Sequence, residues 1–150
     1  MIMISPWVYN GRPYEPPENF SSDDYYGFVY VITNRGTNRK YIGKKFFWSK
    51  KTLPITKTRK RRKRLLVESD WRDYFGSNKQ LNEEVAFQGK DIYHREILHL
   101  CKSKGECAYL EAKEQFDNSV LLREDYYNGI INVRIGGNSV KNLKKQFTNE

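Results

Sequence analysis

The chain has 150 residues, which is long enough for one domain with a hydrophobic core and too short for two comfortable domains. Its 27 Lys and Arg residues exceed its 18 Asp and Glu residues, and the net charge of +9 favours a polyanionic partner, most simply a nucleic acid. Aromatic residues make up 15% of the chain, which argues against disorder, and no apolar run is long enough for a membrane span. The first residues lack the basic start and apolar stretch of a signal peptide, so we expect a cytoplasmic protein.

Residues 1–24 are rich in proline and aromatic residues. Four of the five prolines in the chain lie here, among Trp7, Tyr9, Tyr14 and Phe20. Prolines fix an extended backbone and aromatic rings supply apolar surface to bury, so we expect an arm that lies across the domain. An arm that binds a partner is the alternative.

Residues 27–45 have the pattern of a β-hairpin, with strand-forming residues on either side of a Gly- and Asn-containing turn at 34–38. Each strand carries a tyrosine, Tyr30 and Tyr41, eleven positions apart. Side chains alternate between the faces of a strand, so the two phenols can converge on one spot. Gly43 would let a bulky ligand approach the backbone beside them.

A basic insertion follows at 44–69. Seven of its eight residues from 57 to 64 are cationic: Lys57, Arg59, Lys60, Arg61, Arg62, Lys63 and Arg64. Like charges this dense repel one another, so we expect a solvated loop or a frayed helix until an anion neutralises it. The functional interpretation is a DNA-backbone contact that gives affinity and salt dependence without sequence information. A localisation-like stretch or a merely soluble loop is the alternative.

Two helices and one more strand are expected in the next part of the chain. Ser77 or Asn78 can cap a helix that runs to about residue 88, and residues 93–100 form a third strand that carries both histidines. Ser103 and Glu106 fit a capping box for a second helix, which should run to about residue 116.

Two glutamates of this second helix are candidate metal ligands. Glu111 and Glu114 share a helix face with Cys107 and Leu110, beside an apolar stripe. A carboxylate that faces the protein body needs a cation or hydrogen-bond donors. That cation could be a metal ion, or one of the many Lys and Arg side chains. The two cysteines, Cys101 and Cys107, lack zinc-site spacing and are expected to be buried thiols.

The strings Phe28-Val29-Tyr30 and Tyr41-Ile42-Gly43 resemble the paired motifs of the GIY-YIG nuclease superfamily, with Phe-Val in place of Gly-Ile. The segment Asp73-Tyr74-Phe75-Gly76-Ser77 resembles the DYYGS string of one subgroup, and residues 95–116 resemble its passage from strand to helix. The resemblance spans residues 25–138.

This resemblance implies an α+β fold with a small central three-stranded antiparallel sheet flanked by helices. In this chain, the arm at 1–24 would precede the domain at 25–138, the basic insertion would interrupt it, and a polar tail at 139–150 would follow. A turn at Asn128-Gly129 should lead into a last short strand that ends at about residue 135.

The resemblance also implies a phosphodiester hydrolase that uses one divalent cation, Mg²⁺ or Mn²⁺, held by a helix glutamate. Glu114 is the matching position and Glu111 is the fallback. Tyr30 or Tyr41 would orient or deprotonate the attacking water. Asn132 resembles the late asparagine that supports the family's site by hydrogen bonding.

The family arginine that follows YIG has no direct counterpart, since Lys51 stands ten residues after Tyr41. Candidates for the missing cation are Lys44, Lys45 and Arg72, and we favour Lys44 and Arg72. A lysine supplies charge but not the bidentate fork of an arginine.

The sequence therefore predicts a metal-dependent DNA endonuclease, similar to the short GIY-YIG proteins of phage and mobile elements. If the protein is encoded by a phage, it would act in the host cytoplasm. The DNA target would have to be selected by the basic insertion, the arm, a partner protein or a second copy of the chain. A homodimer would also allow both DNA strands to be cut. The alternative is a non-catalytic nucleic-acid-binding module on the same fold. A ribosomal-type RNA binder rests only on charge and aromatic content.

Overall fold

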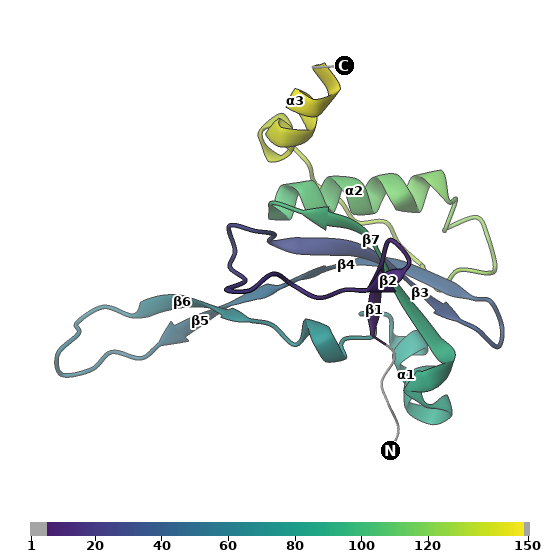
Figure 1. Cartoon of the computed structure of the whole chain (residues 1–150), viewed down its shortest axis with the longest axis horizontal. Coiled ribbons are helices and arrows are strands. Elements are labelled where there is room, and N and C mark those ends of the chain that lie inside the picture. The colour runs from purple at the N-terminus through teal and green to yellow at the C-terminus, as the bar shows by residue number, and fades with distance from the viewer. Residues whose placement is uncertain (1–5, 149–150) are drawn as a thin grey trace.

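A five-stranded sheet forms the centre of the computed structural model, which describes residues 6–148 (Figure 1). The strand order across the sheet is β2-β1-β7-β3-β4. The strands are β1 (Trp7–Tyr9), β2 (Arg12–Pro13), β3 (Gly27–Asn34), β4 (Lys40–Phe46) and β7 (Tyr93–Cys101). The predicted hairpin corresponds to β3 and β4 and the predicted third strand to β7, so the α+β class is confirmed.

The expectation of three strands is wrong in number, because the N-terminal arm adds two more. β3 pairs antiparallel with β4 on one side and with β7 on the other. β1 runs parallel to β7, with Trp7 opposite Arg95, and β2 pairs with β1 at the edge. An open strand edge carries unpaired N–H and C=O groups, and the extended arm satisfies those of β7. The arm therefore lies across the domain, as its composition predicts.

Within the described residues, three α-helices accompany the sheet: α1 (Lys79–Gln88), α2 (Lys104–Asp117) and α3 (Lys141–Thr148). Both predicted helix starts are found. The Asn78 side chain accepts a hydrogen bond from the Leu81 N–H at 3.0 Å, and Ser103 Oγ accepts one from the Glu106 N–H at 3.2 Å. No helix within residues 6–148 is long and apolar enough to cross a bilayer.

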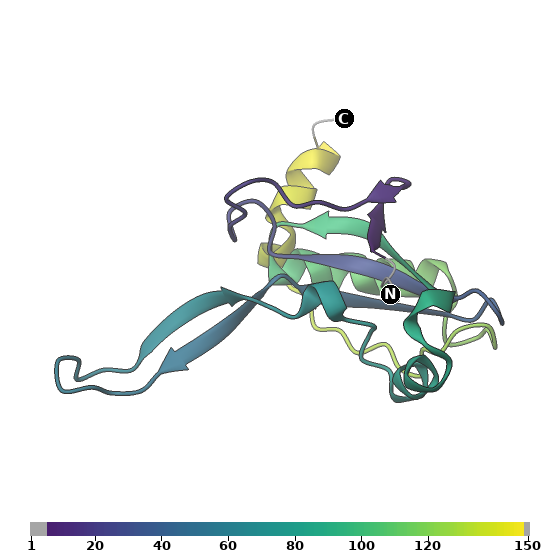
Figure 2. The same ribbon diagram turned by 60° about the horizontal axis from the view of Figure 1, so that its bottom comes forward.

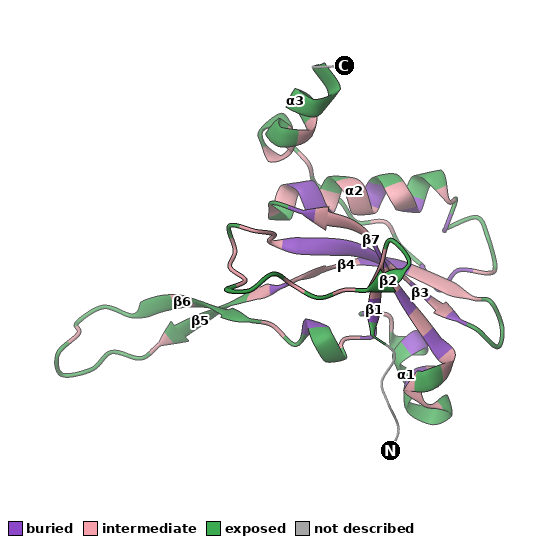
Figure 3. Ribbon diagram, in the orientation of Figure 1, coloured by how far each residue is buried: buried purple, intermediate pink, exposed green. Residues whose placement is uncertain are grey.

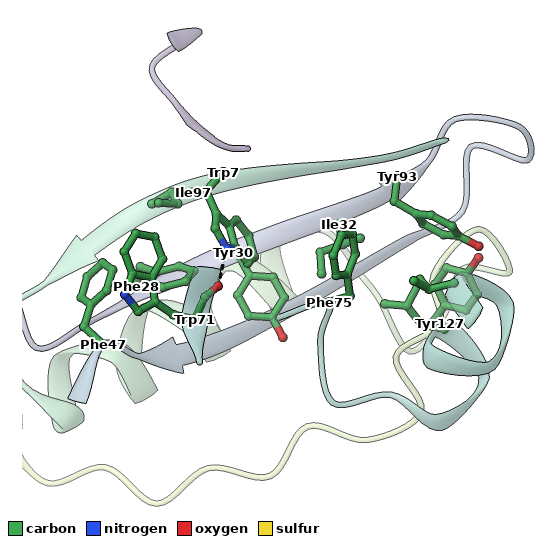
Figure 4. Packing of buried hydrophobic residues seen from close by; sticks show 12 residues of the cluster. Trp7, Phe28, Tyr30, Ile32, Phe47, Trp71, Phe75, Tyr93, Ile97 and Tyr127 are labelled. Atoms are coloured by element: carbon green, nitrogen blue, oxygen red, sulfur yellow. Dashed lines mark hydrogen bonds between the residues drawn. The ribbon is translucent and has the colours of Figure 1, made fainter. Parts of the chain in front are cut away.

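The sheet has a core on each face, because the side chains of β3 alternate. Phe28, Tyr30 and Ile32 enter a mainly aromatic cluster with Trp7 and Trp71 (Figure 4). The Trp7 indole N–H donates to the Trp71 carbonyl at 2.7 Å, which fastens the arm to this cluster. The other face packs against α2, and β3 is buried along most of its length (Figure 3). Residues of this second cluster include Val29, Ile42, Val120 and both cysteines, which are buried free thiols as expected.

The basic insertion forms a β-hairpin, in place of the expected loop or frayed helix. β5 (Trp48–Leu53) and β6 (Lys63–Glu68) pair antiparallel, and the hairpin projects away from the sheet in both views (Figures 1 and 2). Strand-forming Leu65, Leu66 and Val67 make β6 possible. Most of the cations lie on the tip loop at 54–62, where like charges can diverge into solvent.

The predicted last strand is absent between residues 129 and 136, which have no regular structure. Residues 125–128 instead lie along the outer edge of β4. The Lys40 N–H donates to the Asp125 carbonyl at 2.8 Å, and the Tyr127 N–H donates to the Lys40 carbonyl at 2.7 Å. The edge strand that carries Tyr41 is thus held on both sides. After this segment, the chain continues through the 3₁₀ turn η3 (Gly137–Val140) to α3.

Candidate active site

The two motif tyrosines lie on one face of the β3–β4 hairpin. Tyr30 is opposite Gly43 and Tyr41 is opposite Ile32, and the two ring centroids are 6.2 Å apart. A Cβ atom on Gly43 would lie 2.5 Å from the Tyr30 hydroxyl oxygen and 2.9 Å from Tyr41 Cε1. A side chain at position 43 would therefore collide with both phenols, so glycine is required for them to converge.

The environments of the two phenols differ. Tyr30 is fully buried, and within residues 6–148 its hydroxyl has no hydrogen bond of ordinary geometry. Burial, followed by the neighbouring phenols Tyr74 and Tyr41, raises the pKa of Tyr30 well above 10. Tyr41 is partly exposed, and its hydroxyl is 2.9 Å from Ser77 Oγ. Burial also raises the pKa of Tyr41, and the bond to Ser77 acts in the opposite direction. Tyr41 is thus the phenol that water can reach.

A third tyrosine, Tyr74, completes the cluster, although the sequence patterns did not indicate it as a site residue. Its ring lies edge-on to Tyr30, with centroids 5.9 Å apart. It follows the 3₁₀ turn η1 (Trp71–Asp73), and Arg95 Nη1 donates to its carbonyl oxygen at 2.8 Å. The available signal was the DYYGS-like string, in which Tyr74 is the first aromatic residue.

An ion pair joins the tyrosine hairpin to α2. Lys44 Nζ of β4 donates to Glu111 Oε1 of α2 at 3.1 Å, and the two side chains are 32% and 13% exposed. Burial raises the pKa of Glu111, while the Lys44 ammonium lowers it. The charge of Glu111 also contributes to the raised pKa of both Tyr30 and Tyr41, so this carboxylate shares their electrostatic environment.

Glu114 has different neighbours, although it lies one turn from Glu111 on the same helix. His99 Nε2 of β7 is 2.8 Å from Glu114 Oε1, and Asn118 Nδ2 donates to Glu114 Oε2 at 3.3 Å. The sequence placed Glu114 first and Glu111 second. In the structure it is Glu111 that pairs with the hairpin carrying the tyrosines.

Asn132, the predicted supporting asparagine, and the nearby Asn128 have different surroundings. Asn132 is exposed and lies outside any strand. Asn128 is 8% exposed and forms a two-point contact with Ile42, between Tyr41 and Gly43. Its Oδ1 accepts from the Ile42 N–H at 3.1 Å, and its Nδ2 donates to the Ile42 carbonyl at 2.8 Å. The sequence indicated only a turn at Asn128.

The candidate cations separate into two groups. Lys44 belongs to the cluster, and Lys45 lies next to it, with Nζ 4.2 Å from the Tyr74 ring centroid and 2.6 Å from Asp70 Oδ1. The Arg72 guanidinium instead stacks on Trp71 and pairs with Glu68 at 3.3 Å, near the base of the β5–β6 hairpin. Lys51, which stands at the position of the family arginine, lies on the exposed strand β5 of the β5–β6 hairpin.

The donor groups of the cluster fit a hard cation bound through one carboxylate. No group of three or more His, Cys, Asp or Glu side chains gathers as a metal cage within residues 6–148. Glu111 offers a single carboxylate, one oxygen of which accepts from Lys44 Nζ. Mg²⁺ prefers oxygen ligands and retains several waters, so one carboxylate is a sufficient protein anchor.

The seven predicted DNA-binding residues lie on the tip loop and at the start of β6: Lys57, Arg59, Lys60, Arg61, Arg62, Lys63 and Arg64. Six of them are exposed. Arg59 is half-buried because it braces the loop, and its guanidinium donates to the carbonyls of Pro54 and Arg61 at 2.6 and 3.2 Å.

Comparison with protein families gives one match: residues 7–131 fit the family described as "Putative endonuclease segE, GIY-YIG domain". Comparison with curated proteins and with solved structures gives no match. The matched residues contain the arm strand β1, the tyrosine hairpin, the basic insertion and all of α2. The chain therefore belongs to this SegE-type family of GIY-YIG nuclease domains, as the paired tyrosine motifs implied.

Proposed function

We propose that the protein is a metal-dependent endonuclease that hydrolyses phosphodiester bonds in DNA at a site formed by Tyr30, Tyr41, Lys44 and Glu111. Family membership supports the reaction class. The observation that carries the proposal is the Lys44–Glu111 pair, 3.1 Å between Nζ and Oε1, which joins α2 to the strand that carries Tyr41. Phosphodiester hydrolysis needs groups that orient water and groups that neutralise charge on the phosphate, and this cluster offers both.

We infer that Glu111, rather than Glu114, holds the Mg²⁺ or Mn²⁺ ion. Glu111 is supported by its ion pair with Lys44 of the strand that carries Tyr41, whereas the Glu114 carboxylate contacts His99 of β7 and Asn118. A divalent cation bound there would polarise the scissile phosphate and stabilise charge on the leaving 3′ oxygen. Lys44 favours the ionised form of Glu111 and so keeps the carboxylate ready as a ligand.

The phenols have separate roles in this proposal. Tyr30 stays protonated because its pKa is far above neutral, so it acts as a hydrogen-bond donor. Tyr41 is reachable from solvent and orients or deprotonates the attacking water. Lys45, above the Tyr74 ring, supplies the positive charge that the family arginine would bring.

A non-catalytic DNA-binding module is the second candidate. The observation that favours it is the position of Lys51, which lies on the projecting strand β5 instead of beside the phenols. The altered Phe28-Val29-Tyr30 motif points the same way. This candidate predicts salt-sensitive DNA binding without a metal-dependent product.

The two candidates separate in a plasmid-nicking assay with Mg²⁺ or Mn²⁺ and an EDTA control. Wild type and Glu114→Gln should convert supercoiled plasmid to nicked circle, and Glu111→Gln should not. The two variants make the same chemical change one helical turn apart, and thermal unfolding would check that each is folded. Loss of activity in Glu114→Gln alone would show that Glu114, and not Glu111, is the metal ligand. A retarded plasmid band without any nick would favour the binding module.

A further inference from the structure

A cleft of about 430 Å³ lies where the β5–β6 hairpin meets the start of α2. We call it the hairpin cleft. Lys50 and Arg64 line it from the hairpin, and Lys102 and Lys104 line it from the body of the domain. No acidic residue is among the described residues that line it, so both walls are positively charged.

The hairpin register explains why two of these cations share a wall. Lys50 is opposite Leu66 and Arg64 is opposite Thr52, so all four side chains point to the same face of the hairpin. The two body cations are held by neutral groups. Lys102 Nζ donates to the Asp24 carbonyl at 2.7 Å, and Lys104 Nζ lies 5.6 Å from the Phe46 ring centroid.

None of the four cations forms an ion pair with another residue of the segment 6–148. Four uncompensated positive charges around one cleft repel one another and focus a positive potential into it. An anion is the ligand that such a cleft favours. A backbone phosphate fits this chemistry, since lysine and arginine bind phosphate oxygens through charge-assisted hydrogen bonds.

The cleft is aligned with the candidate active site along α2. Lys104 and Glu111 are seven residues apart, so they lie on the same stripe of the helix, about 10.5 Å apart along its axis. β4 repeats this order, because Lys44 pairs with Glu111 and Phe46, two residues later, lies against Lys104. A strand held at Glu111 and running toward the hairpin would therefore meet the cleft.

We propose that the hairpin cleft is a backbone-phosphate subsite for the DNA strand that is cut. This inference rests on the proposed function. The offset along α2 places the subsite a few nucleotides from the scissile bond, since each nucleotide of the strand carries one phosphate. The subsite would fix the strand on one side of the cut without reading its bases.

The test compares two double variants that remove the same charge from the same hairpin. Lys50→Gln with Arg64→Gln empties one wall of the cleft, and Arg61→Gln with Arg62→Gln changes the tip. After the nick of the wild type is mapped, duplexes of that sequence are made with one uncharged methylphosphonate linkage at each position in turn. Wild-type binding should weaken when the uncharged linkage lies at one position a few nucleotides from the cut, on one side only.

The cleft variant should lose this position-specific effect, whereas the tip variant should keep it. The slope of log K against log salt should also fall by about two in the cleft variant. Inorganic phosphate at the same ionic strength should not displace the duplex, because a single free phosphate lacks the neighbouring contacts.

Several results would overturn the subsite. If wild type cuts DNA but no uncharged linkage near the cut weakens binding, or if the cleft variant shows the same positional profile as wild type, the subsite is wrong and the proposed function stands. If free phosphate competes fully, the cleft is a simple anion site. A wild type that neither binds nor cuts DNA would remove the proposed function and the subsite together.

Discussion

Tyr41 is partly exposed, unlike Tyr30, and its hydroxyl is hydrogen-bonded to Ser77. If it deprotonates the attacking water, it must first lose its own proton. Its pKa is raised above 10 by burial, so the ionised fraction is small at neutral pH and grows about tenfold per pH unit below that pKa.

We therefore expect kcat/KM for plasmid nicking to rise with pH from about 6 to about 9 without a plateau. Initial rates measured across this range would test it, and Tyr41→Phe should lose the pH-dependent activity. A plateau below about pH 8 would show that Tyr41 orients water and that another group accepts the proton.

Gly43 leaves the space that the two phenols occupy, so we expect substitution at this position to separate them. A Cβ atom at this position would lie 2.5 Å from the hydroxyl oxygen of Tyr30, a side chain that is fully buried and cannot swing away. Gly43→Ala should destabilise the domain by about 1–3 kcal/mol through overpacking and should abolish nicking by separating the phenols. Urea unfolding would measure the first effect. Gly137→Ala is the matched control, since nothing lies within 4 Å of a Cβ there, and equal stability of the two variants would contradict the argument.

At this scale, the pairing of the two tyrosines could be predicted from the sequence. The different surroundings of Glu111 and Glu114 could not. Alternation along a strand is local, so Tyr30 and Tyr41 follow from the hairpin pattern alone. Glu111 and Glu114 share one helix face, and their difference comes from Lys44 on β4 and His99 on β7. Such pairings join residues that are far apart in the chain, and helix periodicity carries no information about them.

At the scale of elements, Arg95 connects the arm to the active-site loop. This side chain is 1% exposed, lies between the rings of Trp7 and Phe75, and donates to the carbonyls of Arg72 and Tyr74. A buried cation between two rings and two carbonyls fixes the loop that carries Tyr74 against β7.

Arg95→Met would keep much of the side-chain volume and leave both carbonyls without their donor. We expect a loss of about 2–4 kcal/mol in unfolding free energy, and a larger fractional loss of nicking as Tyr74 becomes free to move. Arg72→Met is the control, because that guanidinium is exposed and should cost less than about 0.5 kcal/mol. If Arg72→Met instead abolished nicking in a stable protein, Arg72 would be the missing catalytic cation.

The hairpin and the extra strands show why elements were only partly predictable. The dense cations at 57–64 indicated a solvated loop, and most of them do lie on a loop. The run of three apolar residues, Leu65, Leu66 and Val67, was too short to indicate β6 on its own. The strands of the arm depend on the open edge of β7, which exists only once the sheet has formed.

At the scale of the whole molecule, charge and stability are divided between regions. The aromatic core and the arm hold the tyrosine hairpin rigid, while the projecting β5–β6 hairpin carries cations and little buried surface. An isolated two-stranded hairpin is only marginally stable in water, so a bound polyanion would order it further. The hairpin thus adds cations to the domain body, whose Lys102 and Lys104 form the other wall of the hairpin cleft.

One chain contains one Glu111 cluster, which makes a prediction about the products. A single site hydrolyses one strand per visit, so a monomer should produce nicked circle first and linear plasmid only after a second, independent nick on the other strand. The nicking rate should then increase in proportion to protein concentration. A rate that increases with the square of concentration, with linear product appearing at once, would instead require two chains acting together. Sedimentation of the protein with and without a nicked duplex would distinguish a dimer that forms in solution from one that assembles on DNA.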